Sequence, residues 1–282
     1  MKVTRDRDCH TLSISQELFV EAILAKYNFT DAKPLSIPMD PHVQLSTSQS
    51  PKTTVDIAFM KQVPYRSALR LLMYLAVGTR PDIAFAVSTL VQFTENPGPM
   101  HWEALKRVYR YLVGMKKWLL TYGTERKGLI RYADADGALQ AHRHVISGHA
   151  FLIDRRAISW SSRKQELVTL STTEAKYIAA TQATKEIIWL CRHIGEMFQP
   201  LKSLTILYSN NQSAIMLTKN GNYHTRTKHI DIRYHFICFT IDNGSICLLY
   251  CPTEDMVTDT LTKALPSIKA KHFAFELGLR SV

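Results

Sequence analysis

The sequence lacks paired cysteine motifs and long apolar runs. Its five cysteines are scattered, mostly through apolar segments, and none forms a Cys-x-x-Cys pair. This usage is typical of reduced core thiols and indicates a reducing compartment. The longest apolar run, Leu71 to Gly78, is too short to cross a bilayer. Charged residues stand at the start, where a signal peptide would be apolar. We therefore expect an intracellular protein, cytoplasmic or nuclear, with no secretion or membrane signal.

Acidic residues are also scarce relative to basic ones. The chain has 35 Lys plus Arg against 24 Asp plus Glu, a formal net charge of +11. Such a balance favours a polyanionic partner, because phosphate contacts release counterions, and makes nucleic acid the first candidate. The alternative is a basic globular protein without such a partner. A length of 282 residues and a hydrophobic content of 46% allow one large domain or two ordinary ones.

The first part of the chain is predicted to be mainly helical. Residues 11–16 alternate like a short strand, and residues 17–27 carry apolar side chains at helical spacing. Four prolines and a run of Ser, Thr and Gln predict an extended linker at about 34–54. Further helical patterns cover 65–79, 82–93 and 99–114.

The second part is predicted to be a mixed sheet with flanking helices. Short β-branched or aromatic runs predict an antiparallel meander at 118–122, 129–134, 146–153 and 157–160. A long amphipathic helix follows at 172–197, and Ser171 is placed to cap it. Further strands are expected at 204–209 and 245–251, and further helices at 212–219, 228–242, 254–264 and 268–277. This order predicts an α/β fold.

Four polar residues far apart in the sequence are candidates for a common site. Asp134, Glu174 and Asp259 offer carboxylates, and Asn210 offers an amide of the same shape without the charge. Each lies at the end of an expected strand or on an expected helix, an arrangement that can gather distant carboxylates around divalent metals. Without further knowledge, scattered acidic residues are more often solvated surface groups.

Several further segments follow one another in a specific order: Asp134-Ala135-Asp136, Ile158 to Gln165, Leu170 to Ala175, Asn211 to Ile215, Arg226 to His235 and Asp259 to Lys263. In this order they resemble the ribonuclease H domain of copia-type long-terminal-repeat retrotransposons. Residues 13–122, with the motifs Tyr65 to Ala68 and Thr79 to Ile83, resemble the segment that joins the reverse transcriptase to that domain.

The resemblance therefore implies two parts. Residues 1–122 would be a C-terminal remnant of reverse transcriptase, and residues 127–282 a ribonuclease H-like domain with a mixed five-stranded sheet. The paired aspartates of a polymerase Tyr-x-Asp-Asp turn are absent, so we expect no polymerase activity.

The resemblance implies hydrolysis of RNA in RNA/DNA hybrids by two Mg²⁺ (or Mn²⁺) ions. Asp134, Glu174 and Asp259 would be metal ligands. Asn210 stands where the family has aspartate, and Lys176 stands where the family commonly has a second acid. Because Mg²⁺ prefers carboxylates, we expect metal binding to be weakened and the nuclease to be slow or inactive.

The resemblance also implies contacts with nucleic acid. The residues concerned are Lys164, Gln165, Thr173, Asn211, Gln212, Arg226, Lys228 and His229. The other reading of these residues is ordinary polar surface groups or helix caps. The alternative function is a catalytically inactive relic that still binds nucleic acid. Upstream reverse transcriptase and integrase domains are the other expected partners.

Overall fold

The computed structural model describes residues 1–123, 129–136, 145–167, 169, 171–197, 205–219 and 231–281. Helices dominate the first 114 residues, as predicted. The α-helices there are α1 (Glu17–Lys26), α2 (Thr54–Gln62), α3 (Tyr65–Gly78), α4 (Ala84–Val91) and α5 (Pro99–Gly114). Helix α2 was not predicted. Short 3-10 turns lie at Thr47–Gln49 and Pro81–Ile83. The predicted linker runs between α1 and α2, and its Met39 is buried in the helical core.

The turn after α3 contains a buried ion pair. Pro81 ends the helix because it has no N–H to continue the hydrogen-bond ladder. Arg80, 1% exposed, donates to both carboxylate oxygens of Asp82, at 2.9 and 2.6 Å. Tyr111 on α5 donates to the same carboxylate at 2.8 Å. The pair is fully satisfied, so it fixes the turn between α3 and α4 against α5.

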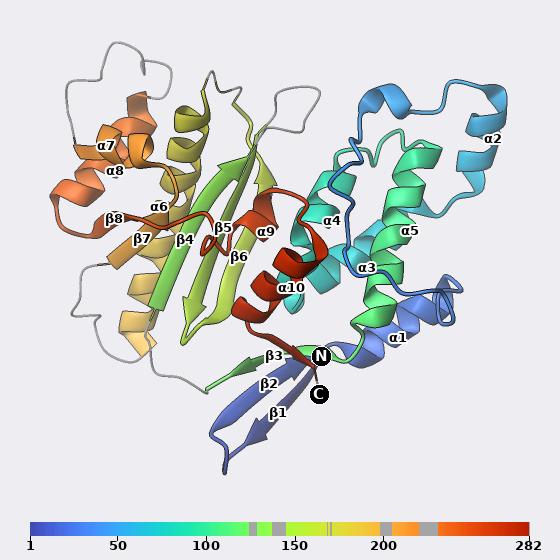
Figure 1. Cartoon of the computed structure of the whole chain (residues 1–282), viewed down its shortest axis with the longest axis horizontal. Helices are drawn as coiled ribbons and strands as arrows, with labels where there is room; N and C mark the ends of the chain where they lie inside the picture. The colour runs from blue at the N-terminus through green and yellow to red at the C-terminus, as the bar shows by residue number, and fades with distance from the viewer. Residues whose placement is uncertain are drawn as a thin grey trace.

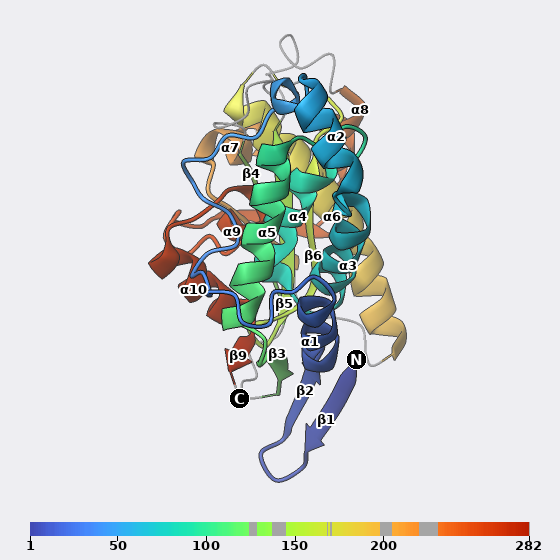
Figure 2. The same cartoon turned by 90° about the vertical axis from the view of Figure 1, so that its right-hand side faces the viewer.

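A four-stranded antiparallel sheet joins the two ends of the chain. Its order is β1 (Lys2–Asp6), β2 (Thr11–Ser15), β3 (Trp118–Tyr122) and β9 (Leu279–Ser281). Strand β1 was not predicted. The prediction that 118–122 starts the meander was wrong, because β3 pairs with β2 and β9 instead. Both termini lie at this sheet (Figures 1 and 2).

The second sheet has five strands in the order β6-β5-β4-β7-β8. They are β4 (Leu129–Asp136), β5 (Ile146–Ile153), β6 (Arg156–Lys164), β7 (Thr205–Ser209) and β8 (Ile246–Tyr250). Strands β4, β5 and β6 are antiparallel, whereas β7 runs parallel to β4 and β8 parallel to β7. Strand β4 is therefore central, which is the position that the candidate site requires.

Helices cover both faces of this sheet (Figure 1). One face carries α6 (Thr172–Met197), α7 (Gln212–Lys219) and α8 (Asp231–Asp242). The other carries α4, α9 (Asp259–Thr262) and α10 (Ser267–Glu276). Helix α6 has the predicted bounds, and Ser171 Oγ accepts a hydrogen bond from Glu174 N at 3.1 Å as its cap. Among the described residues, no helix combines the length and apolar composition of a membrane span.

The helix predicted at 254–264 is largely absent. Thr253 does not open it. Residues 252–259 form consecutive tight turns, in which Asp255 N bonds to Pro252 O and Asp259 N bonds to Met256 O. These bonds join residues three apart, so the segment does not reach α-helical geometry before α9. The four-residue α9 is the remainder.

Hydrogen bonds cross the predicted boundary between residues 1–122 and 127–282. Trp160 Nε1 on β6 donates to Ala76 O on α3 at 2.8 Å. Strand β9 carries the end of the chain back to β3, and Thr121 N bonds to Gly278 O at 3.2 Å. The two predicted parts therefore pack against each other.

Candidate functional site

Asp134 and Asn210 are placed side by side by the parallel pairing of β4 and β7. The register aligns Tyr132 with Tyr208, whose rings stack at 5.5 Å between centroids. Two residues further along each chain come Asp134 and Asn210. Because successive strand residues alternate between faces, both return to the face of their tyrosine. Asp134 is 1% exposed.

Asp259 reaches the same region because α9 lies close against β5. Gly148 pairs with Asp134 across the β4–β5 ladder. A Cβ at Gly148 would come within 2.8 Å of Thr262 Cγ2 and 2.9 Å of Leu261 Cβ. The missing side chain therefore allows α9 to approach the sheet. Thr262 Oγ1 then donates to Asp134 Oδ2 at 3.2 Å, and Asp259 at the start of α9 is fully buried.

A lysine lies between Asp134 and Asn210. Lys176, the fifth residue of α6, donates from Nζ to Asp134 Oδ1 at 2.7 Å and also to Asn210 Oδ1. Burial raises the pKa of Asp134 above its usual value, Lys176 opposes this, and the charge of Asp259 adds to it. The ammonium thus partly offsets the cost of burying this carboxylate.

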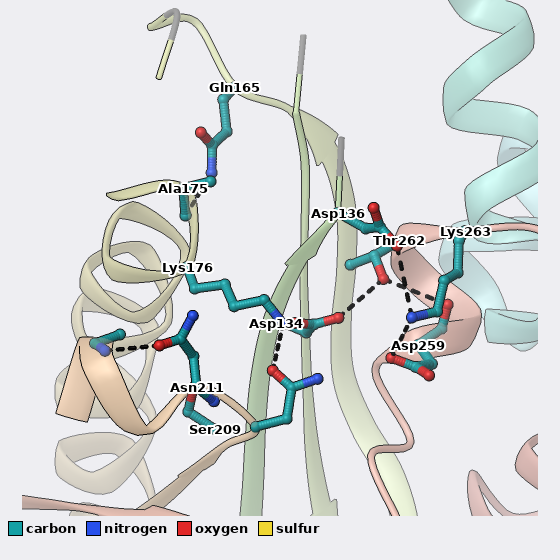
Figure 3. A network of polar contacts seen from close by, with 12 residues as sticks. Asp134, Asp136, Gln165, Ala175, Lys176, Ser209, Asn211, Asp259, Thr262 and Lys263 are labelled. Atoms are coloured by element: carbon teal, nitrogen blue, oxygen red, sulfur yellow. Dashed lines mark hydrogen bonds and ion pairs between the residues drawn. The ribbon is translucent and has the colours of Figure 1, made fainter. Parts of the chain in front are cut away.

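Two further lysines neutralise Asp259. Lys269 Nζ donates to Oδ2 at 3.0 Å. Lys263 Nζ lies 3.0 Å from Oδ1 (Figure 3). Lys263 also lies 3.5 Å from Asp136 Oδ2. Burial lowers the pKa of Lys263, but the carboxylates of Asp259, Asp136 and Asp134 raise it by more, so the net shift is upward. Lys263 therefore remains charged.

The side chains of Glu174 and Lys176 point in different directions from α6. The two residues are two positions apart on α6, so their side chains leave the helix about 200° apart. Glu174 is 7% exposed. Among the described residues, which include Asp134, Glu174 and Asp259, no three His, Cys, Asp or Glu side chains are grouped to hold a metal ion. The expected three-carboxylate metal site is thus not assembled in this structure.

The fit of divalent metals is therefore poor. Lysines contact the carboxylates of Asp134, Asp136 and Asp259. When a lysine already neutralises a buried carboxylate, that carboxylate attracts a divalent cation less strongly. The amide of Asn210 adds no charge to change this balance.

The residues expected to contact nucleic acid have different surroundings. Gln165 is 2% exposed, and its Nε2 donates to Ser147 Oγ at 2.7 Å and to Ala175 O at 2.8 Å. It therefore ties the end of β6 to β5 and α6 and is enclosed. Asn211 Oδ1 accepts from Ala214 N at 2.8 Å and so caps α7. Lys164 and Thr173 are half-buried and Gln212 is exposed. Arg226, Lys228 and His229 lie outside the described residues.

The sequence did not predict that lysines contact the carboxylates of the site. It noted Lys176 as an added charge but did not place it in direct contact with Asp134 and Asn210. It gave Lys263 and Lys269 no role. The spacing of Lys263, four residues after Asp259, was a visible signal for an ion pair on one helical face. Lys269 carried no local signal, because it lies on the next helix.

The order and directions of the five strands, with α6 between the third and fourth, define a ribonuclease H-like α/β fold. The predicted α/β fold with a mixed five-stranded sheet and flanking helices is therefore confirmed, whereas the assignment of the preceding segment to a reverse transcriptase stays a prediction. The structure called "Crystal structure of LC11-RNase H1 in complex with RNA/DNA hybrid" is 13% identical in sequence, with a TM-score of 0.35 over 48% of this chain and 93% of that chain. No family model matches the chain.

Two curated relatives are similar to nearly the whole chain. The chain is 44% identical over its full length to "Retrovirus-related Pol polyprotein from transposon TNT 1-94" of Nicotiana tabacum, of which it covers 21%. It is 35% identical over 96% of its length to "Retrovirus-related Pol polyprotein from transposon RE1" of Arabidopsis thaliana, of which it covers 18%. The chain is thus similar over nearly its whole length to retrovirus-related Pol polyproteins of plant transposons, in agreement with the resemblance of its motifs. It spans about a fifth of the length of these relatives.

Proposed function

We propose that this chain is a ribonuclease H-type domain whose substrate class is the RNA/DNA hybrid and whose hydrolysis of RNA is severely impaired. The observation that supports this most is the contact of Lys176 with both Asp134 and Asn210. Bound Mg²⁺ or Mn²⁺ would supply an activated water and stabilise the leaving oxygen. The lysine-paired carboxylates of this chain do not fit such ions.

A cleavage assay tests the proposal. The full chain would be mixed with an RNA/DNA hybrid labelled on the RNA strand, in Mg²⁺ or in Mn²⁺, and the products separated on a denaturing gel. We expect cleavage to be absent or slower by orders of magnitude than the turnover of about 10 s⁻¹ typical of enzymes. Single-stranded RNA controls for contaminating nucleases. Hybrid-specific turnover near that ordinary rate would overturn the proposal.

A second candidate function is binding of the hybrid without turnover, favoured by the net charge of +11. Fluorescence anisotropy with a labelled hybrid would measure it. We expect the affinity to fall by a factor of at least ~10 between 50 and 200 mM salt, because phosphate contacts release counterions. Lys164, which is half-buried, is a candidate for such a contact. The Lys164→Ala variant should reduce the salt dependence of the affinity for the hybrid. No measurable affinity at low salt would exclude this function.

Because the relatives are polyproteins, we also propose partner domains for this chain. Residues 1–122 are proposed to be a reverse-transcriptase remnant, and reverse transcriptase and integrase domains are the proposed upstream partners. A cytoplasmic or nuclear location remains a prediction of the sequence.

A further inference from the structure

We propose that Lys176 is a tethered counter-cation, whose ammonium takes the place of a divalent ion between Asp134 and position 210 and makes folding of the site independent of metal. The inference rests on the proposed function in one respect, since it takes divalent cations as the ligand class that the ancestral site would bind. It goes further by assigning the loss of metal binding to Lys176 rather than to Asn210 alone.

The first support is that both oxygens of Asp134 are occupied. Oδ1 accepts from Lys176 at 2.7 Å and Oδ2 accepts from Thr262 at 3.2 Å. The Asp134 side chain is 1% exposed and that of Lys176 is 18% exposed. Each inner-sphere bond from Asp134 to a metal would therefore require one of these partners to withdraw. Without Lys176, the carboxylate would be a buried and unpaired charge.

The second support is the charge balance of the surrounding groups. Asp134, Asp136 and Asp259 contact Lys176, Lys263 and Lys269, one positive charge for each negative one. A divalent ion placed among them would meet three ammonium groups at short range, where repulsion is weakly screened. Removal of one ammonium changes this balance in favour of a cation.

The third support concerns position 210. Asn210 Oδ1 accepts a hydrogen bond from Lys176. In the Asn210→Asp variant, a second carboxylate would face the same ammonium, so the variant should hold Lys176 more firmly. Restoration of the aspartate alone therefore should not restore metal binding.

The experiment measures metal binding without any hydrolysis. Thermal unfolding of the full chain would be followed in EDTA and in excess Mn²⁺, with Mn²⁺ binding read independently by electron paramagnetic resonance. Wild type and Asn210→Asp should show no metal-dependent shift in Tm. Lys176→Met should lower Tm by about 10 °C in EDTA, because it leaves Asp134 unpaired. Mn²⁺ should recover several degrees of this loss.

The double variant Lys176→Glu with Asn210→Asp extends the test. It places one carboxylate at position 176, which contacts Asp134, and another at position 210, which contacts Lys176 in the wild type. We expect Tm to rise by about 5 to 10 °C when free Mn²⁺ exceeds its dissociation constant about a hundredfold. Lys185→Met is the matched control, since Lys185 lies on the same helix with an exposed side chain. It should leave the response to Mn²⁺ at the wild-type level.

Two results would overturn the inference. One is Mn²⁺ binding by the wild type as tight as that of the variants without Lys176. The other is metal-dependent stabilisation in Asn210→Asp, a variant that keeps Lys176 and stays informative even if Lys176→Met fails to fold. Failure of the proposed function would be seen separately, as hybrid-specific turnover near the ordinary rate by the wild type in the cleavage assay.

Discussion

At the scale of single residues, His149 on β5 links burial to acid sensitivity. Its ring stacks on Phe151 with 5.0 Å between centroids, and burial lowers the pKa of its imidazole to about 4. The folded chain therefore keeps His149 neutral, whereas the unfolded chain protonates it near the ordinary value of 6.5. As pH falls from about 6.5 to about 4, the unfolded state binds a proton at this histidine and the folded state does not. The free energy of unfolding therefore decreases in this window.

We expect this histidine to cost the wild type up to about 3 kcal/mol of unfolding free energy between pH 7 and pH 4, from a pKa difference of about 2.5 units. Urea unfolding at several pH values would compare the wild type with His149→Gln, which should lose less stability on acidification. His272→Gln is the control, because His272 is exposed on α10. Parallel pH profiles for the wild type and His149→Gln would contradict the prediction.

Residue identity alone predicted the candidate site only in part. Asp134 and Asn210 could be placed near each other from the sequence, because Asp134 ends the expected strand 129–134 and Asn210 directly follows the expected strand 204–209. Glu174 could not be separated from Lys176, since a shift of two residues on a helix decides which side chain reaches the sheet. The phase of α6 depends on its packing against Ala135 and Val145, through Ala175 and Ala179. That contact is tertiary and leaves no local pattern.

At the scale of elements, the approach of α9 to β5 positions the site. Gly148→Ala should destabilise the chain by about 1–3 kcal/mol, because the new methyl group would overlap Leu261 and Thr262. Chemical denaturation would measure the loss. Thr262→Ser in the same background removes the closest atom, Cγ2, but keeps the hydroxyl that bonds Asp134. It should recover part of the stability, and a double variant no better than Gly148→Ala would contradict the steric explanation.

The sequence predicted elements well where periodicity was long and poorly where turns set the structure. Helix α6 has its predicted bounds because apolar spacing continues over 26 residues. Residues 254–264 carry apolar side chains that also suit a helix, yet consecutive turns place Met256 and Val257 in the interior. Strand β3 was predicted as a strand but assigned to the wrong sheet, since strand character does not specify a partner.

At the scale of the whole molecule, the last strand ties the two parts of the chain together. Strand β9 pairs with β3, and Ala157 N at the start of β6 bonds to Leu277 O at 2.9 Å. Leu279 is fully buried with Leu120 and Ala274 in a small cluster, against which Trp118 and Trp160 pack. Pairing between strands more than 150 residues apart leaves no local signal, so the resemblance of separate segments could not predict it. The consequence is a shared core across the proposed boundary.

Because that core is shared, Leu279→Ala should destabilise the entire chain by about 2–5 kcal/mol, the usual cost of a cavity left by leucine. Urea unfolding would be followed by tryptophan fluorescence and by far-ultraviolet circular dichroism. Four tryptophans contribute to the fluorescence, Trp102 and Trp118 before the boundary and Trp160 and Trp189 after it. The fluorescence and the circular dichroism should change in one coincident transition with a lowered midpoint. Ile268→Ala is the control, because Ile268 is 88% exposed on neighbouring α10 and should leave the midpoint unchanged. If the wild type unfolded in two separate transitions, or if Leu279→Ala cost no more than the control, the two parts would be independent domains, and β9 would only lie against β3 without coupling them.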